Sequence, residues 1–201
     1  MSPRAAAKRP QSPARKGPPR QPRRRDGDVI EAAVKVFYEC GYSDATVQDV
    51  ADELGILKGS VYHYIDTKED LLFQLVDEVH TAVQRILEEV EAEEGLDPLE
   101  RLALYVRRQV EYNLENLARI SIYYHDLDRL TGDRLSYVNS SRRIHVDFVT
   151  GLIAAAQKSG AADDSVTPRL LADCVFSTIV GTYRWFRPGR IARKSVGIIV
   201  L

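Results

Sequence analysis

The chain has 201 residues, of which 44% are hydrophobic and 8% aromatic, which is typical of a globular protein and excludes a fibrous or low-complexity chain. No stretch approaches the roughly 18 consecutive apolar residues of a membrane-spanning helix, and no apolar signal-peptide core follows the basic N-terminus, so we expect a cytoplasmic protein without a membrane partner. The two cysteines, Cys40 and Cys174, lack zinc-ligand spacing, and we expect both to be small buried side chains.

The net charge of −1 conceals a strong asymmetry along the chain. Nine of the 28 Lys and Arg residues, and none of the 29 acidic residues, lie in residues 1–25, which leaves 19 basic and 29 acidic residues, or about −10, on the remainder. Six of the nine prolines lie in the same stretch. We expect residues 1–25 to be a disordered arm, either a solubilising tail or, as we favour, a polycation that contacts DNA phosphates.

From Asp26 onward the spacing of apolar residues predicts helices. Ile30, Ala33, Val34 and Phe37 share one face of a first helix over 26–40, and Gly41 ends it. Two later helix starts have a capping box, in which a hydroxyl residue is followed three positions on by a carboxylate: Thr46 with Asp49, and Thr67 with Asp70.

Long helices are predicted for the rest of the chain. One begins near Lys68 and presents an apolar seam as far as Val90, and the others span about 98–116, 120–127, 133–158 and 168–186. No segment alternates as a strand would, so the predicted fold is all-α. Residues 170–186 are apolar around most of the helix, and residues 191–201 add a second apolar strip. We therefore expect both a core contact and a two-fold dimer contact there.

Residues 46–65, TVQDVADELGILKGSVYHYI, form two short predicted helices around a tight turn. Gly55 permits the turn, Val50 and Ala51 face inward from the first helix, and the second is fixed by three apolar residues, Ile56, Val61 and Ile65. The second helix then turns Lys58, Gly59, Ser60, Tyr62 and His63 outward, with Tyr64 at the border. Such a face suits the major groove of DNA, although many helical proteins contain a glycine-centred corner without any such role.

Residues 29–79 resemble the N-terminal domain of the TetR/AcrR family of bacterial regulators. The resemblance lies in the arrangement AA-x-x-x-F-x-x-x-GY-x-x-x-TV-x-DVA-x-x-LGI-x-KGS-x-Y-x-Y-x-x-x-KEDLL. It implies a three-helix helix-turn-helix DNA-binding domain over 26–70 and a helical domain over 71–201 that binds an effector and dimerises through its last two long helices. The implied function is that of a ligand-responsive regulator, most simply a repressor, of a double-stranded DNA operator.

Carried over to this chain, the family's DNA contacts fall on nine residues: Thr46, Gln48, Lys58, Gly59, Ser60, Tyr62, His63, Tyr64 and Lys68, the last on a phosphate. Residues 26–70 contain three basic residues against eleven acids, which is why we assign weight to the basic arm.

The effector side is less defined. The segments PLERL, IYYHDLDRL and YRWFRPG are similar to actinobacterial members of the family that respond to acyl-CoA esters, which implies a hydrophobic or acyl-CoA-type effector and no other cofactor. By periodicity the pocket-lining candidates are six aromatic residues: Tyr105, Tyr112, Tyr123, Phe148, Phe176 and Tyr183. Four arginines are candidates for CoA phosphates, with solvated surface positions as the alternative: Arg107, Arg108, Arg142 and Arg143.

Two alternatives stay open at this point. One is a DNA-binding protein that needs no effector. The other is an enzyme using His125 with Asp126, or Ser140 and Ser141 near His145, although no nucleophile elbow, metal motif or phosphate-binding glycine loop is present.

Overall fold

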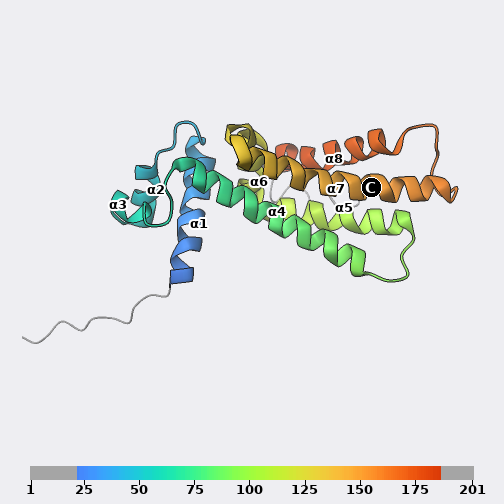
Figure 1. Ribbon diagram of the computed structural model, residues 1–201, viewed down its shortest axis with the longest axis horizontal. Coiled ribbons are helices and arrows are strands. Elements are labelled where there is room, and N and C mark those ends of the chain that lie inside the picture. Colours follow the sequence, from blue (N-terminus) through green and yellow to red (C-terminus); the bar gives the residue numbers. More distant parts are fainter. Residues whose placement is uncertain (1–21, 187–201) are drawn as a thin grey trace, which may run out of the picture.

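The computed structural model describes residues 22–186, and within that range the chain forms α-helices and one 3₁₀-helix without any strand (Figure 1). The all-α prediction is confirmed. Residues 1–21 of the predicted arm and the apolar strip at 191–201 lie outside the described residues. In chain order the helices are α1 (Pro22–Cys40), α2 (Val47–Leu54), α3 (Lys58–Val61), α4 (Lys68–Ala92), α5 (Pro98–Glu115), α6 (Leu117–Asp126), the 3₁₀-helix η1 (Leu127–Arg129), α7 (Gly132–Lys158) and α8 (Pro168–Trp185).

Three of the helix starts are closed by capping boxes. Both predicted boxes are present, and a third closes the start of α5 through Asp97 and Glu100. The start of α1 differs from the prediction, because the helix already begins at Pro22, four residues earlier. Proline suits the first helical position, where an amide hydrogen would have no partner, so the arm's last residues extend α1.

Helices α1 to α3 form a head at one end of the molecule, and α4 runs from the head along the bundle that it forms with α5, α7 and α8 (Figure 1). One buried core joins the head to the first half of α4 and to α6, and includes Phe37, Leu72 and Ile120. A second core fills the distal bundle between α4, α5, α7 and α8. The shared first core means that the head and the helical bundle meet through packed side chains.

The outer face of α8 is exposed and partly apolar. Leu170 and Trp185 are 55% and 45% exposed, and Ile144 on the neighbouring α7 is 52% exposed.

Both cysteines are also exposed, so the prediction of buried cysteines was wrong. Cys40 is the last residue of α1, and Cys174 lies on the exposed side of α8. Within residues 22–186 no helix is both long and apolar enough to cross a bilayer.

Candidate DNA-binding surface and ligand cavity

Helices α2 and α3 pack around the predicted corner. Gly55 has a φ of 64°, and its amide and that of Ile56 donate to the last carbonyls of α2, which closes the turn. Val50, Ala51 and Val61 are fully buried where the two helices meet, as predicted. Ile56, by contrast, is 38% exposed and does not fix the second helix, because it lies in the turn itself.

The second helix is shorter than predicted. It ends at Val61, and the chain continues to Tyr64 through hydrogen bonds of the i to i+3 type, from Tyr64 N to Val61 O (2.9 Å) and His63 N to Ser60 O (3.4 Å). The N-cap residue is Leu57, whose side chain cannot accept the hydrogen bonds of the first amides. A single uncapped turn has little reason to propagate, so the reading face is part helix and part turn.

This face nevertheless presents the predicted side chains to solvent. Lys58, Gly59, Tyr62 and His63 are exposed, with Tyr62 at 45%, whereas Ser60 and Tyr64 are half-buried. The sequence prediction overlooked Leu57, which is 80% exposed beside them. A leucine at a position that favours serine or threonine was the available signal.

Thr46 and Gln48 are exposed at the start of α2, beside the turn. The Thr46 hydroxyl and the Thr46 amide both donate to Asp49 Oδ2 (2.7 Å each). These two hydrogen bonds lower the pKa of the Asp49 carboxyl. Gln48 Nε2 donates to Asp52 Oδ1 (2.7 Å). Both side chains are thus held in fixed positions, which favours a defined contact with a ligand over a mobile one.

Lys68 does not have the geometry of a free phosphate ligand, and its predicted role needs correction. Its ammonium group donates to the carbonyl oxygens of Tyr42 (2.7 Å), Ala45 (2.9 Å) and Ser43 (3.3 Å) and lies 4.4 Å from the centre of the Tyr42 ring. An ammonium has three donors, and here three carbonyls take them. Lys68 therefore fixes the loop between α1 and α2 against α4.

Replacing Lys68 by methionine should lower the free energy of unfolding by about 2 kcal/mol, because hydrogen bonds to a charged donor are lost and half-buried carbonyls remain. Urea unfolding followed by circular dichroism measures the change. The exposed Lys58→Met variant is the matched control, and its stability should stay within about 0.5 kcal/mol of the parent. Equal stability of the two variants would show that the Lys68 contacts contribute nothing.

Between residues 26 and 70 the head has few cations available to DNA. Lys35 forms an ion pair with Glu53 at 2.8 Å, and Lys68 is bound as described above. Of the three lysines in this range, only Lys58 shows no partner within the described chain. Residues 26–70 thus offer shape and hydrogen bonds more than positive charge.

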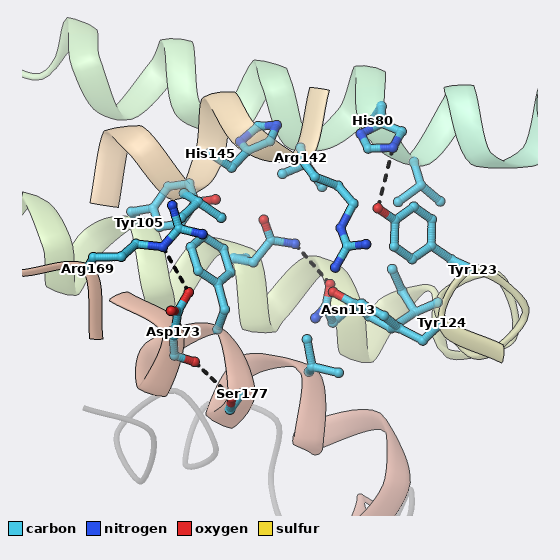
Figure 2. Close-up of a pocket in the computed structure, with 17 residues that line it drawn as sticks. His80, Tyr105, Asn113, Tyr123, Tyr124, Arg142, His145, Arg169, Asp173 and Ser177 are labelled. Carbon is cyan, nitrogen blue, oxygen red and sulfur yellow. Dashed lines mark hydrogen bonds and ion pairs between the residues drawn. The ribbon is translucent and has the colours of Figure 1, made fainter. Parts of the chain in front are cut away.

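A cavity of about 390 Å³ lies in the bundle between α4, α5, α6, α7 and α8 (Figure 2). This volume falls in the range of small-molecule sites. Three predicted residues, Tyr105, Tyr123 and Phe176, line it. The other three do not: Phe148 packs edge-on against Tyr105, Tyr183 stacks on Tyr124 at 5.6 Å, and Tyr112 packs against the first core. Periodicity identified the inward face but not which inward residues border empty space.

Polar groups that the sequence prediction did not select also line the cavity. Four of their atoms are buried without a hydrogen-bond partner within the described residues: Tyr105 OH, Gln109 Oε1, Asn113 Nδ2 and His145 Nδ1. Buried polar atoms in folded proteins nearly always have a partner. The spacing of residues 105, 109 and 113 along the inner face of α5 was the sequence signal for this group.

The positive charge in the cavity comes from Arg142, whose guanidinium projects into it from α7 (Figure 2). Arg169 stands nearby and pairs with Asp173 at 3.2 Å. Arg142 and Arg169 also border an adjoining depression together with Arg143. Among the other predicted arginines, Arg108 is paired with Glu89 and Glu93, and Arg107 is exposed on α5. The arginine cluster at 142, 143 and 169 thus forms a cationic mouth, in which Arg143 pairs with Asp147 at 3.5 Å and Arg142 carries the charge left unpaired within the described residues.

Two buried histidines, His80 and His145, complete the wall. Burial lowers the pKa of each from 6.5 to about 4, and for His80 the nearby His145 adds to the effect. His80 Nε2 lies 3.4 Å from the Tyr123 hydroxyl. Both imidazoles are therefore neutral at pH 7 and serve as hydrogen-bonding groups, while Arg142 carries the charge.

Stability should fall with acidification because of these histidines. Once unfolded they bind protons near pH 6.5 but in the folded protein only near pH 4, so their contribution is complete above pH 6.5 and is lost as the pH falls toward 4. We expect the free energy of unfolding to drop by about 4 kcal/mol between pH 7.5 and 5.0, which is about 2 kcal/mol for each histidine. Urea unfolding at both values measures this drop. A His80→Gln/His145→Gln variant should show a smaller one, and an equal drop in both proteins would contradict the assignment.

The residues considered for catalysis are not arranged as a catalytic group. Ser140 and Ser141 donate to the carbonyls of Ser136 and Tyr137, one turn back on α7. His125 Nδ1 and Nε2 lie 3.3 Å from the Ser121 hydroxyl and 3.4 Å from that of Tyr183. The geometry of these residues therefore gives the enzyme alternative no support.

Both halves of the chain match known protein families. Residues 29–75 match the profile of bacterial regulatory proteins of the tetR family, and residues 95–197 match the tetracyclin repressor-like C-terminal domain. The HTH-type transcriptional repressor KstR2 of Mycolicibacterium smegmatis is 29% identical over 193 residues, covering 89% of this chain and 88% of its own. The fatty acid metabolism regulator protein of Bacillus subtilis is 25% identical over 157 residues, covering 75% and 77%.

Solved structures show the same fold over most of the chain. AibR in complex with isovaleryl coenzyme A and operator DNA superposes with a TM-score of 0.79 at 24% identity, covering 88% of this chain and 96% of AibR. The ketosteroid transcriptional regulator KstR2 of Mycobacterium tuberculosis gives 0.76 at 26% identity, covering 88% and 92%. The arrangement of head and bundle is thus shared with these proteins.

Proposed function

The chain belongs to the TetR family of bacterial regulatory proteins, and on that premise we propose that it is a cytoplasmic repressor released from its operator by an acyl-CoA-type effector. The observation that carries the proposal is the presence, on one molecule, of an exposed reading face on α3 and a bundle cavity with a cationic mouth. Helix α6 connects the two.

The proposed DNA contacts come from the start of α2 and from the α3 face. Thr46 and Gln48 supply a hydroxyl and an amide, and residues 58–64 supply an ammonium, hydroxyls, an imidazole and aromatic carbons. Hydroxyl and amide groups hydrogen-bond to phosphates or base edges, while aromatic carbons contact thymine methyl groups. Lys68 is left out of this set because its ammonium is bound within the protein.

We propose that the protein acts as a homodimer through the exposed faces of α7 and α8. Ile144, Leu170 and Trp185 lie on these faces, and apolar surface of this kind favours a two-fold contact. Such a dimer would set its two reading faces about one DNA turn apart, roughly 34–36 Å, as helix-turn-helix dimers require.

The effector proposal rests on the cavity and is supported by the relatives. AibR has been crystallised with isovaleryl coenzyme A. In this chain the apolar part of a thioester would enter the bundle, and its phosphates would lie near Arg142, Arg143 and Arg169. Guanidinium groups bind phosphates through paired, charge-assisted hydrogen bonds.

Helix α6 supplies a route from the cavity to the head. Ile120 and Tyr123 of α6 line the cavity, and both belong to the core that the head shares. On the same helix Arg119 forms ion pairs with Glu31 of α1 and Glu78 of α4. A ligand that prefers a different position of Tyr123 would shift the population of head positions, which is all that release requires.

Gel shifts with the DNA that flanks the protein's own gene test the proposal. We expect a specific shift that at least one member of a set of long-chain and ring-derived acyl-CoAs abolishes. A shift that no thioester changes would favour a DNA-binding protein without an effector. Absence of any shift on a wide set of promoter fragments would overturn the proposed DNA-binding function.

A further inference from the structure

The inner wall of the cavity contains two side-chain amides, each with one atom that forms a hydrogen bond and one that has no partner within the described residues. Gln109 Nε2 donates to Asn113 Oδ1 at 2.9 Å, which leaves Gln109 Oε1 and Asn113 Nδ2 free and buried. Exchanging the oxygen and nitrogen of both amides would reverse the bond but would still leave one free carbonyl oxygen and one free NH₂. In either orientation the pair therefore offers one donor and one acceptor to whatever occupies the cavity.

Two further free atoms face the same space. Tyr105, one turn before Gln109 on α5, has a fully buried hydroxyl without a partner within the described residues, and His145 Nδ1 is in the same state on α7 (Figure 2). A plain hydrocarbon chain in the cavity would leave the four atoms without hydrogen bonds, whereas a ligand oxygen that reaches them would supply partners. The wall therefore favours a ligand with an oxygen at this place over a plain hydrocarbon chain.

We propose that the effector carries a hydroxyl or keto oxygen on the part that enters the cavity, where Tyr105, Gln109 and Asn113 bind it, while its anionic part lies toward Arg142. This inference rests on the proposed function and adds to it that unsubstituted fatty acyl groups are poor effectors. The oxygen has to lie beside the inner face of α5, because three of the four free atoms belong to that helix.

The free atoms also predict which of the two kinds of oxygen binds with the higher affinity. A keto oxygen accepts from Asn113 Nδ2 and the Tyr105 hydroxyl but cannot donate. A hydroxyl accepts from the same groups and in addition donates to Gln109 Oε1 or to the unprotonated nitrogen of His145. The expected order of affinity at equal chain length is therefore hydroxyl, then keto, then unsubstituted.

The test uses the full chain and coenzyme A thioesters of six, eight and ten carbons. Each length is supplied unsubstituted, with a terminal hydroxyl, and with a keto group next to the terminal carbon, and both binding and operator release are measured. The best oxygenated thioester should bind at least about tenfold more tightly than the unsubstituted thioester of its length. Equal or tighter binding of the unsubstituted thioester at every length would overturn the inference.

A double variant tests whether the preference for an oxygenated thioester depends on Gln109 and Asn113. In Gln109→Leu/Asn113→Leu the amide pair is replaced by side chains of similar size, so the preference for an oxygenated thioester should disappear and the unsubstituted one should bind more tightly. Glu111→Gln, on the exposed face of the same helix, should keep the parent preference. An unchanged preference in the double variant would overturn the inference. If no thioester binds the parent protein, the effector class itself is wrong, and the inference falls with it.

Discussion

Replacing Tyr62 by alanine should lower the affinity for the operator at least about 30-fold, because a dimer loses the contact twice and each contact contributes roughly 1–3 kcal/mol. Tyr62 is 45% exposed at the end of α3, on the same face as Lys58 and His63. Its removal leaves the head core intact, since Val61 and Ile65 provide the buried contacts there. The affinity is measured by fluorescence anisotropy on the operator, with random DNA for comparison.

Tyr38→Ala is the matched control for this experiment. Tyr38 is 56% exposed near the end of α1 and belongs to the same domain but not to the reading face. Its removal should leave operator affinity within about twofold of the parent, as expected of a surface substitution. Unchanged affinity in Tyr62→Ala would remove the assignment of the reading face.

Replacing Arg142 by alanine should raise the effector concentration needed for operator release at least about 10-fold, because a hydrogen bond to a charged group contributes about 1.5–3 kcal/mol. Of the guanidinium groups in the cavity wall, only that of Arg142 has no partner within the described residues. The neutral histidines beside it supply no charge. Operator affinity without effector should stay as in the parent, since Arg142 lies in the bundle. Titration of the operator complex with the effector measures both quantities.

Arg107→Ala supplies the control here. Arg107 is exposed on α5 and does not line the cavity, so its removal should leave the release concentration unchanged. If the two variants respond alike, the effect is one of net charge, and Arg142 does not bind the effector directly.

The predictions that succeeded rest on local chemistry. The capping boxes at Thr46 and Thr67 and the left-handed turn at Gly55 are each fixed by a few adjacent residues, and the structure contains all three. The inward face of each long helix likewise follows from spacing alone. These features depend on residues that are close together in the sequence, so the sequence predicts them directly.

The predictions that failed depend on partners distant in the sequence. Lys68 looked free until the fold brought the carbonyls of residues 42 to 45 beside it. Phe148 and Tyr183 face inward as predicted, but their neighbours fill the space that would have made them cavity residues. The polar wall formed by Gln109, Asn113 and His145 was not predicted, because inward-facing amides and imidazoles in a helix sequence look the same whether they border a cavity or are hydrogen-bonded in a packed core.

The scarcity of unpaired lysines in the head determines how the complex should respond to salt. Each phosphate neutralised by a lysine or arginine releases condensed counterions, and the slope of log affinity against log salt concentration counts these contacts at about 0.9 per phosphate on duplex DNA. With Lys35 and Lys68 paired inside the protein, Lys58 is the head lysine left to contribute. A shallow slope would thus describe a complex held by residues 26–70 alone, and any excess would count the phosphates neutralised by the basic residues that precede Asp26.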